Sequence, residues 1–170
     1  ALDTALAPRA IVLRNDSPVR EHEGLPLTHS VAKGTFDGPV ELVEGDARFL
    51  ADLTEGQKTG WFYDQRDNRA FVARLARGRR CIDFYTYAGG FAIQLALGGA
   101  SHVVAVDRSQ ASLALAEGAA RLNGVDLETC QGDSFRELER RAALGERYGV
   151  VIADPPAFAK RKKDVGPALK

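Results

Sequence analysis

Residues 80–107 read RCIDFYTYAGGFAIQLALGGASHVVAVD, and this stretch decides the fold class of the 170-residue chain. Its pattern predicts a strand over 80–85, a short apolar helix over 90–97 that ends at two glycines, and a buried strand over 102–106. The same alternation continues with a helix that starts after Ser109 and stops at Gly124, a strand over 127–131, a helix over 134–144 and a strand over 149–153. Strands that alternate with helices of this length predict an α/β fold with a parallel, doubly wound sheet.

The chain has a different character before about residue 60. There the sequence holds short β-type runs, separated by turn-forming clusters, over 10–14, 39–43 and 47–51. These runs predict a small antiparallel sheet or a set of hairpins. An amphipathic pattern then predicts a helix over 67–77. We therefore expect a β-rich subdomain over 1–60 and the N-terminal part of a larger α/β domain over 61–170.

Composition excludes several classes of protein. Lys and Arg number 23 and Asp and Glu also number 23, so the formal net charge is zero, which argues against a histone-like nucleic-acid binder. Two cysteines, Cys81 and Cys130, cannot form a disulfide scaffold and show no metal-ligand spacing, so we expect no metal and a reduced, cytoplasmic setting. No run of 18 apolar residues is present, and we expect no membrane partner. The chain starts at Ala1 and contains no methionine, as expected of a trimmed chain.

Four carboxylates fall near or just after the ends of the predicted parallel strands: Asp83, Asp107, Asp133 and Asp154. In doubly wound sheets a ligand lies beyond the carboxyl ends of the strands, where the strand order reverses. Helix capping alone would place Ser, Thr and Asn there as often as Asp. The four acids therefore predict a ligand site at this edge of the sheet.

The loop after the first parallel strand favours a cofactor without phosphate. A dinucleotide site needs the longer glycine pattern GxGxxG, which is absent, so a nicotinamide oxidoreductase is disfavoured. Gly89 and Gly90 would let the backbone approach a ligand closely at a helix start. S-adenosylmethionine (SAM) carries a carboxylate, an amine and a sulfonium cation, which aromatic rings can face favourably. The candidate rings are those of Phe84, Tyr87 and Phe91.

Residues at the next two strand ends complete the predicted cofactor pocket. Asp107, beside Arg108, would accept hydrogen bonds from ribose hydroxyls, by the same logic as in dinucleotide folds. Asp133 and Ser134 follow the third strand, where a carboxylate or nearby backbone could bind an adenine amino group. The three strand ends together would hold the sulfonium, the ribose and the adenine.

The segment Asp154-Pro155-Pro156-Ala157-Phe158 directly follows an apolar strand. Two prolines fix an extended turn and remove two backbone donors, so carbonyls and the Asp154 carboxylate remain as acceptors. This arrangement suits the exocyclic amine of a flipped nucleobase, on which Phe158 could stack. The basic run Lys160-Arg161-Lys162-Lys163 follows at once, and we interpret it as an RNA phosphate contact.

Four segments together resemble the bacterial 23S ribosomal RNA large-subunit methyltransferases, and among them the cytosine-C5 enzymes with a central β-hairpin subdomain. These segments are 59–69, 83–91, 105–109 and 154–160. The resemblance implies a Rossmann-like class I methyltransferase sheet, here truncated after about four parallel strands, with SAM as methyl donor and 23S ribosomal RNA as substrate.

The same resemblance implies roles for individual residues. Gln65 and Arg66 would line the cofactor pocket. Asp107 would hold the ribose and Asp133 the adenine end. Asp154 would bridge the cofactor and the target base.

The chain departs from that family at both ends. Family members carry an N-terminal PUA-type RNA-binding domain, and they continue into three more strands that hold a Ser-Cys-Ser-type segment. In cytosine-C5 chemistry a cysteine thiolate adds to C6 and makes C5 nucleophilic. Cys81 and Cys130 lie in predicted strands, where buried residues are expected. We therefore expect the nucleophile beyond Lys170 and the fragment alone to be inactive.

Other functions stay open at this point. Guanine N-methylation of ribosomal RNA needs no cysteine, because an Asp-Pro-Pro-Phe motif also serves direct transfer to an amine. A non-catalytic module that binds SAM or RNA is a second alternative. A parallel sheet that stops after four strands exposes an edge, so we also expect a second copy of the chain or the rest of the enzyme to cover it.

Overall fold

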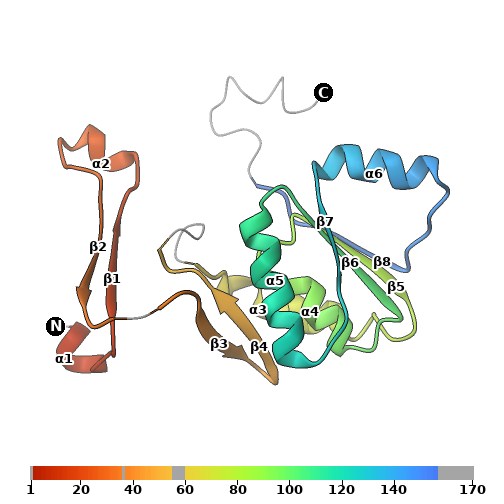
Figure 1. The fold of residues 1–170 in the computed structure, drawn as a ribbon, viewed down its shortest axis with the longest axis horizontal. Coiled ribbons are helices and arrows are strands. Elements are labelled where there is room, and N and C mark those ends of the chain that lie inside the picture. The colour runs from red at the N-terminus through yellow and green to blue at the C-terminus, as the bar shows by residue number, and fades with distance from the viewer. Residues whose placement is uncertain (1, 36, 55–59, 157–170) are drawn as a thin grey trace.

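The computed structural model describes residues 2–35, 37–54 and 60–156. Its centre is a four-stranded parallel sheet with the strand order β7-β6-β5-β8 (Figure 1). These strands are β5 (Arg80–Phe84), β6 (His102–Asp107), β7 (Glu128–Gln131) and β8 (Val150–Ala153). The chain builds outward from β5 to β6 and β7 and then returns to the other side of β5. The strand order therefore reverses beside β5, as the sequence predicted for a doubly wound sheet.

Side chains alternate between the two faces of this sheet. Cys81, Val103 and Ala105 pack in one buried cluster with α4 (Gly90–Leu97). Ile82 and its neighbours on the adjacent strands fill the opposite face. That second face meets α6 (Ser134–Ala143), whose Leu138 and Ala142 line a hollow together with Ile82. Helices on both faces confirm the predicted layered α/β fold.

Local signals set the helix boundaries. Ser109 caps α5 (Gln110–Asn123) by accepting a hydrogen bond from the Ser112 backbone N–H, and Gly124 ends the helix with φ 64°. Both predictions are confirmed, as are the bounds of α4. The helix expected over 67–77 is the shorter α3 (Arg66–Ala73). In the described part of the chain, no helix is both long enough and apolar enough to cross a membrane.

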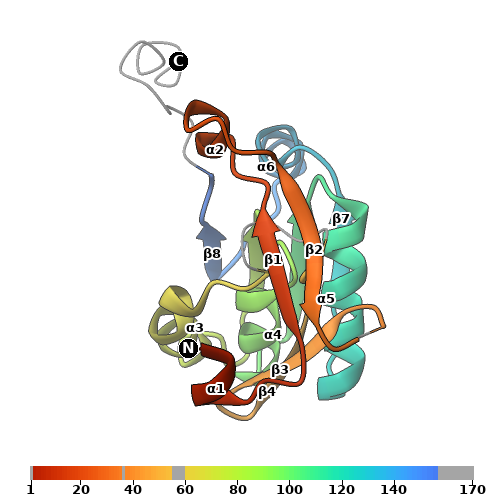
Figure 2. The same ribbon diagram turned by 90° about the vertical axis from the view of Figure 1, so that its left-hand side faces the viewer.

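Two separate hairpins form the N-terminal part. One pairs β1 (Ile11–Asn15) with β2 (Thr28–Lys33), and the other pairs β3 (Val40–Glu44) with β4 (Ala47–Ala51). The first hairpin stands away from the parallel sheet at the left of Figure 1 and faces the viewer in Figure 2. The sequence did not predict β2, nor the short helices α1 (Leu2–Leu6) and α2 (Val19–His22). Every residue of β2 is exposed, so it lacks the alternating pattern that marks a half-buried strand.

The second hairpin packs on the α/β sheet. Phe49 of β4 is fully buried in a cluster with Trp61, Ile93 and Ala119. Gly118 of α5 makes this approach possible, because a Cβ there would lie 2.5 Å from the Leu50 Cδ1. Hairpin and sheet thus share one core, and the subdomain boundary near residue 60 stays a prediction.

A buried ion pair joins this hairpin to α3. Glu44 is 5% exposed and Arg69 is 3% exposed. The Arg69 Nε donates to Glu44 Oε1 at 2.8 Å, and the Trp61 Nε1 donates to Glu44 Oε2 at 3.2 Å. A further Arg69 nitrogen donates to the Phe62 carbonyl at 3.0 Å. Burial raises the pKa of the Glu44 carboxyl, but the Arg69 hydrogen bonds and charge outweigh it and the pKa is lowered overall.

We expect Glu44→Gln to destabilise the protein by on the order of 3 kcal/mol, because it leaves the Arg69 charge buried without its counter-charge. Glu41→Gln on the same strand is the matched control: Glu41 pairs with Arg48 at 2.7 Å, but both side chains are exposed. That surface pair should contribute less than about 1 kcal/mol. Denaturant unfolding of both variants measures the difference, and equal losses would contradict the role given to the buried pair.

Candidate functional site

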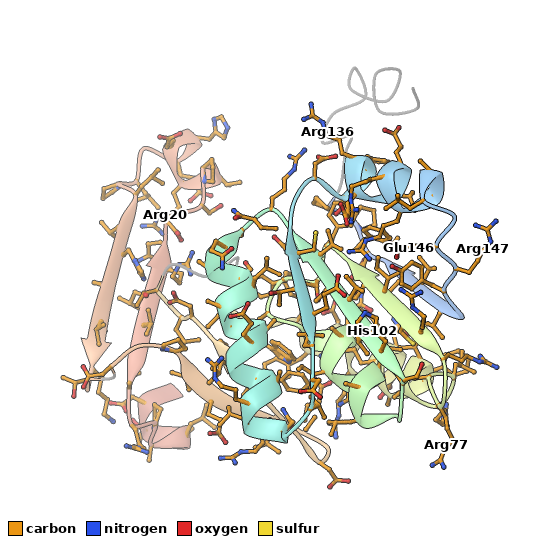
Figure 3. The ribbon with its side chains drawn as sticks, turned by 45° about the vertical axis from the view of Figure 1, so that its right-hand side comes forward. Arg20, Arg77, His102, Arg136, Glu146 and Arg147 are labelled. Atoms are coloured by element: carbon orange, nitrogen blue, oxygen red, sulfur yellow. The ribbon has the colours of Figure 1, made fainter. Side chains whose placement is uncertain are left out.

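The candidate site lies at the carboxyl ends of the parallel strands, where the strand order reverses beside β5. Arg136, labelled in Figure 3, belongs to the first turn of α6 at this edge, whereas Arg77 lies just before β5 at the opposite edge. All four carboxylates predicted from the sequence lie at or near these strand ends, but they do different things there. Two hold protein segments together, one caps a helix and one meets a side chain of the α3 region.

Asp107, the last residue of β6, ties three loops together. Its Oδ2 accepts a hydrogen bond from the Tyr87 N–H, and its Oδ1 accepts one from the Ser109 N–H, both at 2.9 Å. Its main-chain carbonyl accepts from the Gly132 N–H at 2.9 Å. A carboxylate oxygen can accept two hydrogen bonds, so each oxygen keeps capacity for a ligand hydroxyl. The arrangement therefore fits the predicted ribose acceptor, which stays a prediction.

The loop between β5 and α4 is strained. Tyr85 and Tyr87 adopt left-handed backbone conformations, with φ 61° and 51°. For residues other than glycine such conformations cost on the order of 1–3 kcal/mol each, and they gather at ligand sites. The Thr86 N–H donates to the Val106 carbonyl at 3.1 Å, and the Tyr87 hydroxyl donates to the Gly60 carbonyl at 3.2 Å. No pattern in a single sequence marks a left-handed tyrosine, so this feature was not predicted.

Asp83 serves the protein interior. It is 1% exposed, and its Oδ2 accepts from the Thr86 hydroxyl at 2.6 Å and from the Ala92 N–H at 3.1 Å. Burial is the largest cause that raises the pKa of this carboxyl, to about 7; the nearby charges of Asp107 and Asp154 add to the rise, and the hydrogen bonds from Thr86 and Ala92 oppose it. Asp83 thus binds the loop through Thr86 and the start of α4 through Ala92, from the buried side.

Some of the predicted glycines and aromatic rings pack against protein, and others are partly exposed. A Cβ on Gly89 would lie 2.8 Å from the Ala116 Cβ, and one on Gly90 would lie 3.2 Å from the Arg69 Cδ, so the close approach in the structure is to protein. Phe84 is 4% exposed and sits in the core with Ile82. Tyr87 and Phe91 are half-buried; the Phe62 ring meets Tyr87 edge-on at 5.9 Å, and the Arg69 guanidinium lies 6.0 Å from the centre of the Phe91 ring.

Asp133 is the N-cap of α6 and faces Arg108. Its Oδ1 accepts from the Arg136 N–H at 3.0 Å, and its Oδ2 pairs with the guanidinium of the exposed Arg108. These interactions, first the Arg136 N–H and then Arg108, hold the pKa of Asp133 below its usual range. Ser134 beside it is buried. Capping explains Asp133 without a ligand, and its predicted role toward adenine stays a prediction.

Asp154 meets the start of α3. The Gln65 Nε2 donates to Asp154 Oδ2 at 3.2 Å, which brings together two residues that the sequence had placed in one pocket. Asn68, which sequence reasoning missed, donates from its Nδ2 to the Gln65 Oε1 at 2.7 Å. Arg66, Pro155 and Pro156 are exposed. Phe158 and the basic run Lys160, Arg161, Lys162 and Lys163 lie outside the described residues.

Neither cysteine has the surroundings of a nucleophile. Cys81 is fully buried in β5, and burial raises the pKa of its thiol. Cys130 is half-buried, and burial and the Glu137 carboxylate raise the pKa of its thiol. Both therefore favour the unreactive thiol form.

Known proteins resemble this chain over nearly its whole length. The family described as "S-adenosylmethionine-dependent methyltransferase" matches residues 28–165. Ribosomal RNA large subunit methyltransferase I of Erwinia tasmaniensis is 37% identical over 169 residues, and that of Aeromonas salmonicida is 39% identical over 166. The alignments cover 97% and 95% of this chain but 43% and 42% of the relatives, so the chain spans less than half of their length.

Solved structures show the same fold. The methyltransferase SMU.776, crystallised in complex with SAH, is 26% identical and superposes with a TM-score of 0.70 over 80% of this chain and 37% of that one. A SAM-dependent methyltransferase from Agrobacterium tumefaciens is 19% identical and superposes with a TM-score of 0.74 over 94% of this chain and 50% of that one. The second similarity supports the fold alone.

The raised pKa of Asp83 predicts a pH dependence of stability. Between about pH 4 and pH 7 the folded protein keeps a proton on Asp83 that the unfolded chain releases, so the free energy of unfolding falls as the pH rises through this window. Asp83→Asn should remove this decline, so the variant gains stability relative to the wild type as the pH is raised. Urea unfolding at several pH values tests this, with Asp46→Asn in an exposed turn as control. Parallel curves for the Asp83 variant and the wild type would disprove it.

Proposed function

The chain belongs to the S-adenosylmethionine-dependent methyltransferase family, and from that premise we propose that it forms the cofactor-binding part of an enzyme that methylates ribosomal RNA. The observation that carries the proposal is the presence of two carboxylates at the same edge of the sheet, on either side of β5. Asp107 ends β6 and Asp154 follows β8, and both strands pair with β5. A cofactor and a base bound at these two strand ends would be neighbours.

The residues at the Asp107 end fit SAM. The cofactor supplies a methyl group made electrophilic by a sulfonium. Asp107 has free acceptor capacity for the two ribose hydroxyls, and the half-buried rings of Tyr87 and Phe91 offer faces to a cation. We propose that Asp133, Ser134 and Arg108 lie at the adenine end. The glycines Gly89 and Gly90 and the buried Phe84 would then shape the pocket through packing rather than by contact.

The residues at the Asp154 end suit a nucleobase. The carboxylate and the carbonyls beside Pro155 and Pro156 are acceptors, and Gln65 steadies the carboxylate from the α3 side. We propose that Asp154 bridges cofactor and base, that Phe158 stacks on the base, and that the run from Lys160 to Lys163 contacts RNA phosphates. The names of the relatives from Erwinia and Aeromonas support ribosomal RNA as the substrate.

We further propose cytosine C5 as the target atom. This carbon becomes nucleophilic when a thiolate adds to C6. Burial disfavours the thiolate of Cys81 and of Cys130, so we assign the nucleophile to a cysteine outside these 170 residues. The relatives are more than twice as long as this chain. We propose that further sequence of that kind completes the active site together with this chain.

Asp107→Ala in the full-length protein should weaken SAM binding by roughly 1–3 kcal/mol, because a charged acceptor for the ribose is lost. Asp126→Ala, an exposed acid at the opposite edge of the sheet, should bind SAM as the wild type does. Isothermal titration calorimetry with SAM, SAH and NAD measures both variants. Saturable NAD binding without SAM binding by the wild-type protein would overturn the assignment of the cofactor.

The full-length protein should transfer a labelled methyl group from SAM to 23S ribosomal RNA, whereas residues 1–170 alone should not. Cys81→Ser and Cys130→Ser should leave turnover within about twofold of the wild type, since a core serine replaces the thiol without removing chemistry. Thermal unfolding of both variants controls for folding. Methylation of cytosine by the fragment, or loss of turnover in a folded serine variant, would show that the nucleophile lies within this chain.

A further inference from the structure

A chain of two hydrogen bonds leads from the first turn of α3 to Asp154. Asn68 donates to the Gln65 Oε1 at 2.7 Å, and the Gln65 Nε2 donates to Asp154 Oδ2 at 3.2 Å. The direction of both bonds follows from the Asp154 carboxylate. An ionised carboxylate only accepts, and an amide offers an oxygen at one end and N–H groups at the other. Gln65 can satisfy Asp154 in only one orientation of its amide, and the Asn68 N–H holds the amide oxygen in that orientation.

The two amide side chains occupy positions that ordinarily stabilise the helix itself. Gln65 is the N-cap of α3 and Asn68 is the third residue within it, the pair of positions that exchange hydrogen bonds in a capping box. Among the described residues, α3 has no side-chain capping hydrogen bond at Gln65. Helix caps contribute about 1 kcal/mol. Here the Gln65 amide instead bonds Asp154 and the Asn68 amide bonds Gln65. A helix start that forgoes its own cap in this way is typical of a functional site.

The platform that carries these amides is rigid. Arg69 directly follows Asn68, and its guanidinium is buried against Glu44, Trp61 and the Phe62 carbonyl. Asp154 follows β8, whose Ala153 pairs with Phe84 of the central strand. Both ends of the hydrogen-bond chain are therefore fixed by packed elements, as a site that must hold its geometry requires.

We propose that Asn68 is a positioning residue: its N–H fixes the amide orientation of Gln65, which holds Oδ2 of Asp154 and leaves Oδ1 for the bound base or cofactor. Asn68 touches neither ligand in this arrangement and acts through Gln65. The proposal rests on the role proposed above for Asp154. It adds a residue outside the pocket whose chemistry decides how the carboxylate is presented.

Asn68→Asp provides the sharpest test, since the side chain keeps its shape and loses its donor. The Gln65 amide then has a carboxylate at each end but N–H groups at only one, so one of its two contacts sets an acceptor against an acceptor. In the full-length protein we expect kcat for methyl transfer to ribosomal RNA to fall about tenfold or more, with KM for the RNA changed less than about twofold. The matched control is Asp67→Asn combined with Asn68→Asp, which keeps the charge and composition of the turn. It should show the same loss of kcat.

A second measurement does not depend on activity. Asp154→Asn combined with Asn68→Asp reverses both hydrogen bonds: the amide introduced at position 154 donates to the Gln65 oxygen, and the Gln65 N–H donates to the carboxylate introduced at position 68. Asn68→Asp should raise the unfolding equilibrium constant about fivefold in the wild-type background and leave it nearly unchanged in the Asp154→Asn background.

Equal effects of Asn68→Asp in both backgrounds would overturn the proposal, as would wild-type kcat in the Asp67→Asn/Asn68→Asp variant. If the unfolding data show the expected dependence but Asp154→Asn retains full methyl transfer, the proposed role of Asp154 fails and the hydrogen-bond chain stands.

Discussion

The geometry of the candidate site depends on the hydrogen bonds of Asp107. One residue accepts from the loop after β5, from the start of α5 and from the loop after β7. The first of these bonds restrains Tyr87, whose left-handed backbone conformation costs free energy in a residue other than glycine. The carboxylate thus shapes the loop before any ligand binds. Because its oxygens retain acceptor capacity, the same group can serve the proposed ribose contact without giving up its structural role.

The Asp154 side of the candidate site is held by α3 and the β3–β4 hairpin. The buried pair of Glu44 and Arg69 fixes α3 on the β3–β4 hairpin, and α3 in turn carries Gln65 and Asn68 toward Asp154. A hairpin that precedes the methyltransferase sheet in sequence therefore sets the position of a side chain at its far strand. The hairpin and the sheet also share one buried cluster around Phe49.

The sequence predicts the part of the fold and of the site that local chemistry controls. Ser109 and Gly124 are recognisable as the residues that start and end a helix, so the bounds of α5 were predictable. Strand β2 was not predictable, because both of its faces are exposed and its hydrophobicity therefore does not alternate. Four acids at strand ends predict the edge at which a site would lie. Which side of a strand faces a helix is settled by tertiary packing, so the buried position of Asp83 was not foreseen. Asn68 carried no signal either, since its importance arises from a contact with Gln65, whose own partner is 89 residues away.

That long separation has a consequence for synthesis. Glu44 and Arg69 are 25 residues apart, so the hairpin and α3 can close their loop early, whereas Gln65 and Asp154 must wait for β8 to emerge from the ribosome. The Asp107 side of the proposed site is likewise complete once β7 and Gly132 have emerged, since the Gly132 N–H supplies the last hydrogen bond to Asp107. We expect the nascent chain to acquire the proposed cofactor side first and the proposed base side later. Translation itself would then separate the two halves of the site in time.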